Sequence, residues 1–288
     1  MKSQAECPAF PFYLCILYIF YMPFCNQMNA LSKIKISAVS FLNTLPFIYG
    51  IRKSGLMNQI ELSLDTPIEC ADKLYKNEAD AGLIPIASIP EMKESFVISD
   101  YCISAKGIVS SVVLLSEVPM EKIKFILTDY RSRTSVQLLK ILLHNYWNNS
   151  PVLLQTKAGY ETEIKNETAG LVIGDNALLL KKNFPFVYDL SEAWFEMTSL
   201  PFVFACWVSN KKLPENFIEQ FNASLRFGIN HIDEAVAEQE DKTFPADELM
   251  SYLKNNISYL LDDDKKKGMK LFFEFLKKEE LSSLKDFA

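Results

Sequence analysis

The chain has 288 residues, of which 49% are hydrophobic and 23% are charged, and its formal net charge is −6. This composition is close to that of average folded globular proteins, so an intrinsically disordered chain is not indicated. No cluster of Lys and Arg offsets the negative charge, which argues against a nucleic-acid partner because neutralising phosphates needs such a cluster. An acidic protein can still bind a small anion through backbone N–H groups at a helix N-terminus.

The first 31 residues are predicted to form an N-terminal extension outside the fold. Residues 9–25 are apolar and aromatic, and three interpretations of them stay open: a signal peptide, a membrane anchor, or a true translation start at Met28. The flanks fit a signal peptide poorly, because Lys2 is the one positive charge before the run and no small-residue cleavage site follows it. Prolines interrupt the run, which is also short for a membrane span. We favour the start at Met28 and expect no membrane insertion.

The common catalytic and metal-binding signatures are missing from the sequence. It has no GxGxxG, GxxxxGK[ST], HExxH or GxSxG motif, so nucleotide-binding, zinc-protease and serine-hydrolase functions lose their main support. Six cysteines, at positions 7, 15, 25, 70, 102 and 206, form no CxxC pair, and we interpret them as reduced, mostly packing residues. His144 and His231 lie in amphipathic segments, where surface or packing roles are expected. No metal site is therefore predicted.

A first series of alternating strands and helices is predicted from Lys33 onward. Its elements are a strand at 34–39, a helix at 46–55, a strand at 59–65, a helix at 66–76 and a strand at 79–86. Thr66 and Glu69 form a capping box at the start of the second helix, with Pro67 at the first helical position. This β-α-β-α-β order implies a parallel sheet covered by helices on both faces.

Two β-rich segments, 94–104 and 108–119, lead into a second αβ series. That series comprises a strand at 124–130, a helix at 135–147, a strand at 151–157, a strand and helix within 169–182, a strand at 186–190 and a long apolar strand at 200–210. From Pro214 to the end the pattern is helical. We predict two lobes joined by crossing strands, lobe 1 from residues 32–115 plus 208–288 and lobe 2 from 116–207. Ligands of open α/β sheets bind beyond the carboxyl ends of strands, so a cleft is expected between the lobes.

Small polar groups follow several of the predicted strands. Asn43 and Thr44 stand in the sequence SFLNTLPFIYG, where both are also ordinary helix-capping residues. The sequence SRTSVQLL places Ser132, Thr134 and Ser135 at a helix start, which is a potential carboxylate or phosphate cradle. Thr134 with Gln137 is equally a capping box.

Two further corners carry similar alternatives. Ser110 and Ser111 interrupt an apolar strand, either as hydrogen-bonded structural residues or as ligand contacts. Gly174 and Asp175 lie at a strand-to-helix corner, where Asp175 suits an N-cap.

Taken together, the corners resemble a known family. SFLNTLPFIYG, KGIVSSVVLLS, SRTSV, VIGDNAL and LPFVFACWVSN, in this order and spacing, are similar to segments of the chorismate dehydratases of the futalosine route to menaquinone. The resemblance runs from about Lys33 to Trp207. It implies a two-lobed α/β fold of the type II periplasmic-binding-protein kind with a ligand cleft and a helical C-terminal tail. It also implies a cytoplasmic hydro-lyase without a cofactor, which converts chorismate to 3-[(1-carboxyvinyl)oxy]benzoate and water.

The same resemblance assigns roles to individual residues. It implies that Asn43 and Ser111 are catalytic. It further implies that the substrate is bound by Thr44, Ser110, Arg133, Thr134, Ser135, Gly174 and Asp175, with Thr134 and Ser135 holding a carboxylate. Lys106 departs from the family, which commonly has an acidic residue there, and this change affects the expected rim of the cleft. Nothing in the sequence indicates an oligomeric state.

Two questions about the chemistry stay open at this point. We hypothesise that the enolpyruvyl carboxylate of the substrate accepts the ring proton, and Asp175 is the nearest rival base. The function also has alternatives: a sister enzyme of the same pathway and fold, acting later on a dehypoxanthine futalosine-type substrate, or a solute-binding protein for a small carboxylate.

Overall fold

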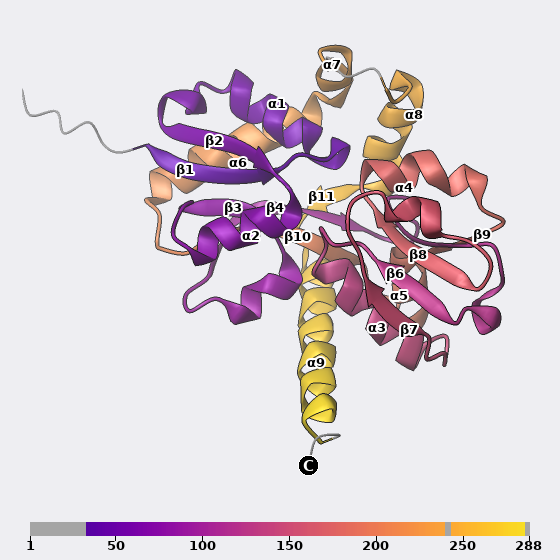
Figure 1. Ribbon diagram of the computed structural model, residues 1–288. Helices are drawn as coiled ribbons and strands as arrows, with labels where there is room; N and C mark the ends of the chain where they lie inside the picture. The colour runs from indigo at the N-terminus through magenta and orange to yellow at the C-terminus, as the bar shows by residue number, and fades with distance from the viewer. Residues whose placement is uncertain (1–32, 240–242, 286–288) are drawn as a thin grey trace, which may run out of the picture. The chain divides into compact units, whose positions relative to one another are not determined.

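Two β-sheets organise the chain (Figure 1). The first has six strands, in the order β11 (Ser258–Leu260), β4 (Phe96–Ala105), β10 (Phe202–Ser209), β3 (Ala81–Pro85), β1 (Ile34–Val39) and β2 (Ile60–Asp65). The second has five, in the order β7 (Val152–Gln155), β6 (Phe125–Thr128), β8 (Thr168–Ile173), β5 (Val112–Ser116) and β9 (Phe186–Asp189). The structure is a computed structural model that describes residues 33–239 and 243–285. The predictions for the N-terminal extension and for the first three cysteines lie outside these residues.

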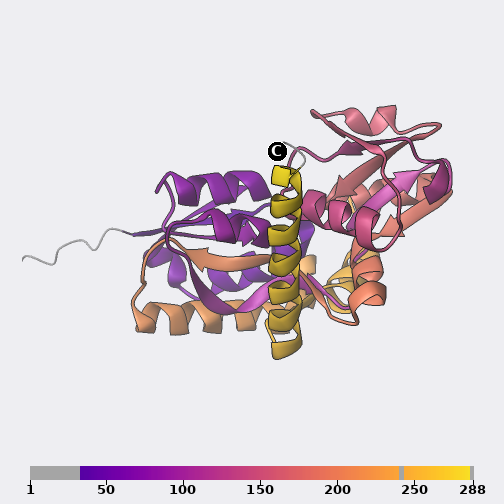
Figure 2. The same ribbon diagram turned by 90° about the horizontal axis from the view of Figure 1, so that it is seen from below.

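Helices cover both sheets. With the six-stranded sheet lie α1 (Leu45–Lys53), α2 (Pro67–Tyr75), α6 (Glu215–Asn230), α7 (Ile232–Ala237) and α8 (Ala246–Ser251). With the five-stranded sheet lie α3 (Thr134–Asn145), α4 (Asp175–Leu180) and α5 (Leu190–Thr198). The last helix, α9 (Asp263–Lys285), packs against both β10 and α3 and therefore contacts elements of both sheets (Figure 2). Within the described residues, no helix has the length and apolar character to cross a membrane.

The predicted parallel pairing holds for three neighbouring strands at one edge of each sheet. β1 runs parallel to β2 and β3, and β6 runs parallel to β7 and β8. β10 runs antiparallel to β3 and β4, and β5 runs antiparallel to β8 and β9. These antiparallel strands stand next to the two places where the chain passes between the sheets, from β4 to β5 and from α5 to β10.

The residues of β5 are all buried and pack alternately on the two faces of the second sheet. Val112 and Leu114 belong to the main hydrophobic core, together with residues of α3 and α5. Val113 and Leu115 point to the other face and join a smaller cluster that includes Ala177 of α4. A strand with apolar residues on both faces is buried on both, which explains the continuous apolar run VVLL in the sequence.

Several sequence predictions are confirmed by this structure. The capping box of α2 is present, because the Glu69 N–H donates to Thr66 Oγ1 at 3.4 Å and the Thr66 N–H donates to Glu69 Oε2 at 2.8 Å. Cys70, Cys102 and Cys206 are buried and free, as expected of packing residues.

The later part of the chain differs from the sequence predictions in two elements. The tail after Pro214 is not wholly helical, because β11 pairs with β4. A strand of three residues has too little local pattern to show in the sequence, and it is stabilised by the neighbouring strand. The nine-residue helix α5 was not predicted either.

The predicted lobe boundaries at 115/116 and 207/208 cut through β5 and β10. β5 belongs wholly to the second sheet and β10 wholly to the first. We propose to draw the lobes by sheet membership instead.

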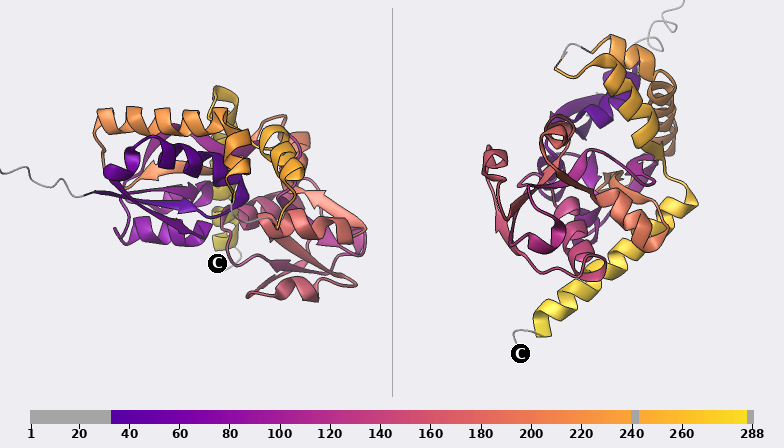
Figure 3. Two further views of the ribbon diagram at one scale, coloured as in Figure 1. Left: turned by 90° about the horizontal axis from the view of Figure 1, so that it is seen from above. Right: turned by 90° about the vertical axis from the view of Figure 1, so that its right-hand side faces the viewer.

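The close packing of α1 against α6 fixes the region that follows β1. Figure 3 shows α6 beside α1 on one face of the six-stranded sheet and α2 on the other. Gly50 of α1 and Gly228 of α6 allow the contact: a Cβ on Gly228 would lie 1.8 Å from the carbonyl oxygen of Pro46, and one on Gly50 would lie 2.0 Å from that of Ser224. Because both obstacles are backbone atoms, they cannot move aside as a flexible side chain would.

We therefore expect Gly228→Ala to lower the free energy of unfolding by at least roughly 1–3 kcal/mol, the usual cost of overpacking. Urea denaturation followed by circular dichroism measures it. Glu219→Ala, on the exposed side of the same helix, is the matched control and is expected to unfold like the wild type. A Gly228→Ala protein as stable as this control would contradict the packing described here.

Candidate active site

A cavity opens where residues of the two sheets face each other. Its empty volume is about 550 Å³, counting the part that is open to solvent. The residues of the first sheet and its helices that line it are Val39, Phe41, Asn43, Thr44, Pro67, Leu83, Pro85, Ile103, Phe204 and Ala205. Those of the second are Val109, Ser111, Val112, Ser132, Thr134, Ser135, Ile173 and Gly174. Six of the nine predicted site residues therefore meet here: Asn43, Thr44, Ser111, Thr134, Ser135 and Gly174.

Asn43 lies in a tight corner between β1 and α1. One turn of 3-10 helix, Leu42–Thr44, links the two elements, and Pro46 stands in the first turn of α1. The Thr44 hydroxyl lies 2.6 Å from the carbonyl oxygen of Val39 and 2.7 Å from that of Phe41. Thr44 occupies the N-cap position, but its side chain makes no bond to the helix. The capping role expected for it is therefore wrong: its hydroxyl holds the corner against the end of β1.

The Asn43 corner is also held by two residues that lie far from it in the sequence. The Leu42 N–H donates to Asp175 Oδ1 at 3.0 Å, and the Tyr259 hydroxyl donates to the Asn43 carbonyl at 3.1 Å. Asn43 Oδ1 is buried and has no hydrogen-bond partner among the described residues. A buried amide oxygen without a partner costs roughly 1–3 kcal/mol, so its presence in a cavity wall marks a position for a ligand donor.

Ser111 is placed by a buried carboxylate, that of Asp189. Asp189 Oδ2 accepts the N–H groups of Val109 at 3.0 Å and Ser110 at 2.6 Å, while Oδ1 accepts those of Ser191 and Glu192 at the start of α5. Burial raises the pKa of Asp189 above its ordinary value, although these four N–H groups lower it. The contacts hold the segment between the two sheets in the conformation that presents Ser111.

Ser110 supplies the bend just before Ser111. Its backbone is left-handed, with φ of +66°, and its N–H is bound to Asp189. Ser110 is not among the cavity-lining residues. The structure thus gives Ser110 a part in shaping the loop, and the predicted substrate contact stays without support from the geometry.

The first turn of α3 presents hydroxyls to the cavity. Ser132 Oγ accepts the N–H of Ser135 at 3.0 Å, and Thr134 Oγ1 accepts the N–H of Ala87 at 3.1 Å. A threonine hydroxyl that accepts this bond keeps its own proton for a further partner. The predicted capping box of Thr134 with Gln137 is not formed, because Ser132 takes that part. The N-terminal end of a twelve-residue helix adds a favourable field for an anion.

Arg133 points away from the hydroxyls of Ser132, Thr134 and Ser135. Its guanidinium pairs with Asp72 at 2.9 Å and Glu91 at 3.3 Å and lies 5.4 Å from the centre of the Tyr75 ring. It is not among the cavity-lining residues. The geometry therefore assigns Arg133 to joining α3 with α2 and does not support its predicted contact with the substrate.

Gly174 and Asp175 join the cavity walls at the end of β8. Gly174 has φ of +65° and ψ of −143°, and a Cβ there would lie 3.0 Å from three carbons of the Phe41 ring. Glycine is needed for this conformation and for this approach. The Gly174 N–H donates to the Ser111 carbonyl at 2.8 Å. Asp175 is the first helical residue and not the N-cap, and its carboxylate binds Leu42 instead of lining the cavity.

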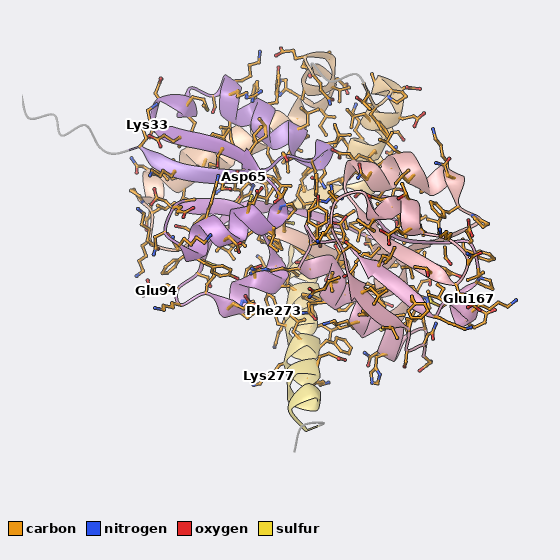
Figure 4. The ribbon with its side chains drawn as sticks, in the orientation of Figure 1. Lys33, Asp65, Glu94, Glu167, Phe273 and Lys277 are labelled. Atoms are coloured by element: carbon orange, nitrogen blue, oxygen red, sulfur yellow. The ribbon has the colours of Figure 1, made fainter. Side chains whose placement is uncertain are left out.

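No side chain that lines the cavity is an acid or a base, as the described residues show. The nearby carboxylates are bound elsewhere. Asp65, at the end of β2 (Figure 4), accepts from Lys73, Ser37 and Ser63 and has a lowered pKa, while the contacts of Asp175 and Asp189 are given above. In the same part of the chain, no group of three His, Cys, Asp or Glu could hold a metal ion.

The sequence did not reveal the residues that stand behind the cavity wall. The Tyr252 hydroxyl donates to Ser111 Oγ at 2.8 Å, and Tyr259 binds the Asn43 carbonyl, as described. Both tyrosines belong to the tail that the sequence pattern presents only as helical. Asp189 is the N-cap of the unpredicted α5. An aspartate in this position is a sequence signal for a helix start, and it could have revealed both α5 and the role of Asp189. Lys106, which was expected to affect the rim of the cleft, lies over the Phe195 ring outside the cavity lining.

Comparison with known families places this cavity in context. Residues 34–278 match the model of a family described as menaquinone biosynthesis. The chain belongs to this family. A chorismate dehydratase of Thermus thermophilus is 25% identical over 267 residues, which cover 82% of this chain and 92% of that protein. A chorismate dehydratase of Campylobacter jejuni is 26% identical over 190 residues, or 64% and 71% of the two chains. The family resemblance stated from the sequence is confirmed.

Solved structures show the same fold. A protein of Archaeoglobus fulgidus superposes with a TM-score of 0.69 at 16% identity and covers 86% of this chain and 98% of that chain. A Candida albicans protein described as having the generic periplasmic binding protein fold gives 0.57 at 12% identity, with 84% and 90% covered. The periplasmic aliphatic sulphonate-binding protein of Escherichia coli gives 0.53 at 13% identity, with 84% and 87% covered. The predicted periplasmic-binding-protein-like fold is thereby confirmed.

The role of Asp189 can be tested by Asp189→Asn. The new amide turns one acceptor into a donor, so two of the four buried N–H groups lose their partner at a cost of roughly 1–3 kcal/mol each. We expect a lower free energy of unfolding in urea and a displaced Ser111, visible in a crystal structure of the variant. Asp247→Asn, in the exposed first turn of α8, is the control. Equal stability of the two variants would show that Asp189 does not hold the segment.

Proposed function

We propose that this protein is a chorismate dehydratase. It would convert chorismate to 3-[(1-carboxyvinyl)oxy]benzoate and water as a cytoplasmic hydro-lyase of the futalosine route, without a cofactor. The family match and the two relatives named chorismate dehydratase support the assignment. The cavity supports it independently, because apolar walls and a few neutral hydrogen-bond donors suit a small ring that carries carboxylates.

One observation carries the proposal: the cavity offers donors but no acid or base. Dehydration of chorismate needs a base for a ring proton and a proton for the departing hydroxyl. The substrate brings both. Its enolpyruvyl carboxylate takes the ring proton, the ring C–O bond breaks with its electron pair on the hydroxyl, and that hydroxyl receives the proton and leaves as water. The electron pair of the former C–H bond completes the aromatic ring, which supplies the driving force.

The protein then acts by holding the substrate in a reactive conformation. Thr134 and Ser135, with the N-terminal end of α3, would bind a carboxylate of the dianion. The Ser111 hydroxyl and the amide N–H group of Asn43 would donate to the leaving hydroxyl and stabilise the charge that develops on it, while Asn43 Oδ1 would accept from a donor of the substrate. Reacting groups that belong to one bound molecule also avoid the entropy cost of an encounter. Asp175 is disfavoured as a rival base, because its carboxylate binds Leu42 and does not line the cavity.

The direct test is to incubate the purified full chain with chorismate and follow the products by chromatography and mass spectrometry. Loss of one water to an enolpyruvyl benzoate is the expected result. A folded protein that produces none of it would overturn the proposal. If that same protein binds chorismate, measured by calorimetry, it is a solute-binding protein for a small carboxylate. The fold shared with the sulphonate-binding protein is the observation that keeps this second candidate in view.

Asn43→Ala is expected to lower kcat by roughly 100-fold or more, as loss of one donor to a developing oxyanion does. Its Cβ retains the corner, because the backbone bonds of Leu42 and Asn43 are unchanged. Steady-state formation of the product measures the effect, and Asn58→Ala at an exposed position serves as the control. Near-normal turnover by a folded Asn43→Ala protein would remove Asn43 from the mechanism.

Ser135→Ala is expected to act on binding instead. A hydrogen bond to a charged group is worth about 1.5–3 kcal/mol, so KM is expected to rise by roughly 10-fold or more while kcat changes little. The exposed Ser95 supplies the matched control Ser95→Ala. A fall in kcat at constant KM would instead place Ser135 at the reacting atoms and not at a bound carboxylate.

A further inference from the structure

The hydroxyl of Tyr252 stands directly behind the cavity wall. Tyr252 begins a five-residue turn of π-helix, Tyr252–Asn256, between α8 and β11. Only 4% of its surface is exposed, and it is not among the residues that line the cavity. Turns of π-helix are rare and occur often at functional sites. Tyr252 therefore cannot touch a ligand itself, but it can act on a residue that does.

That residue is Ser111, whose hydroxyl forms part of the cavity wall. Tyr252 donates to Ser111 Oγ at 2.8 Å, in a bond that is wholly buried. Burial raises the pKa of Tyr252 far above its ordinary value, and Asp175 and Asp189 raise it further. A phenol whose pKa lies above its ordinary value of about 10 is protonated near neutral pH and can act as a donor.

Because Tyr252 is the donor in this bond, Ser111 remains free to donate its own proton. A serine hydroxyl has one proton and two lone pairs. With one lone pair occupied by Tyr252, the Ser111 proton is left to point into the cavity. Tyr252 thus acts on one of the two side chains to which the proposed mechanism gives the leaving hydroxyl.

We infer that Tyr252 is a positioning residue of the proposed reaction, which turns the Ser111 hydroxyl toward the leaving group of the substrate. The inference rests on the proposed dehydratase function. Hydrogen bonds in a chain polarise one another, so a serine that accepts from a phenol is also a better donor to a developing oxyanion. Tyr252 exchanges no proton with the substrate. Its effect passes through Ser111.

A purely structural role and a positioning role of the Tyr252 hydroxyl predict different effects on stability and turnover. Tyr252→Phe keeps the ring that fills the core and removes only the hydroxyl. If the hydroxyl served stability alone, the variant would have a lower melting temperature and unchanged turnover. If it positions Ser111, kcat falls while KM, which reflects carboxylate binding at α3, stays nearly constant.

The test compares the full-length wild type with Tyr252→Phe, Ser111→Ala and the double variant, measuring kcat and KM for chorismate at enzyme concentrations that keep slow variants measurable. We expect Tyr252→Phe to lower kcat by about 10- to 100-fold, the range seen when residues that orient a ligating group are removed, with KM within about twofold. In the Ser111→Ala background the same change is expected to lower kcat by less than about twofold, because coupled residues are not additive. Tyr188→Phe, which removes a phenol bonded to the Met120 N–H away from the cavity, controls for loss of a tyrosine hydroxyl.

The outcomes separate the two hypotheses. A folded wild type that does not dehydrate chorismate overturns the proposed function, and the inference falls with it. An active wild type with a Tyr252→Phe variant of unchanged kcat overturns the inference alone. Equal losses from Tyr252→Phe in the wild-type and Ser111→Ala backgrounds also overturn it, because Tyr252 would then act independently of Ser111.

Discussion

The buried carboxylate of Asp189 is the interaction on which the rest of the site depends. The chain must leave the first sheet after β4 and enter the second at β5, and the intervening backbone has N–H groups that no strand can satisfy. Asp189 accepts two of them and, with its other oxygen, two at the start of α5. The Asp189 side chain thus binds the segment that passes between the two sheets and also caps the start of α5. The left-handed Ser110 and the position of Ser111 are consequences of this arrangement.

A second set of contacts ties the opposite wall to the first. The Ser111 carbonyl accepts from Gly174, the neighbouring Asp175 accepts from Leu42, and Leu42 precedes Asn43. The two side chains proposed to act on the leaving group are therefore joined through backbone and carboxylate bonds that reach across the cavity. Such bonds cost little to maintain once the backbone is folded, because no long flexible side chain has to be ordered. Preorganised donors of this kind are what electrostatic catalysis needs.

The sequence predicted the fold more fully than it predicted the site. Apolar alternation and the Thr66–Glu69 capping box located strands and helices, because those signals are local. The corner motifs also pointed to Asn43, Ser111, Thr134 and Ser135, all of which line one cavity in the structure. The missing information concerned direction and distance. Whether Arg133 or Thr134 faces the cavity depends on the rotation of α3, and the partnership of Tyr252 with Ser111 joins residues 141 positions apart. Such long-range contacts leave no periodic pattern in the sequence.

A cavity of neutral donors also bears on how one fold can serve both binding and catalysis. Solved proteins of this fold include one named for binding sulphonates, and a site that captures anions needs donors and a helix N-terminus but no acid or base. The same equipment is sufficient for dehydration when the ligand contains its own proton acceptor and gains an aromatic ring. The difference between the two functions then lies in the direction of the donors. Donors that face a stable carboxylate only bind the ligand, whereas donors that face a departing hydroxyl lower the activation barrier of the reaction. By this argument the direction of the Ser111 hydroxyl, more than the presence of any catalytic acid or base, would separate the proposed dehydratase from a binding protein.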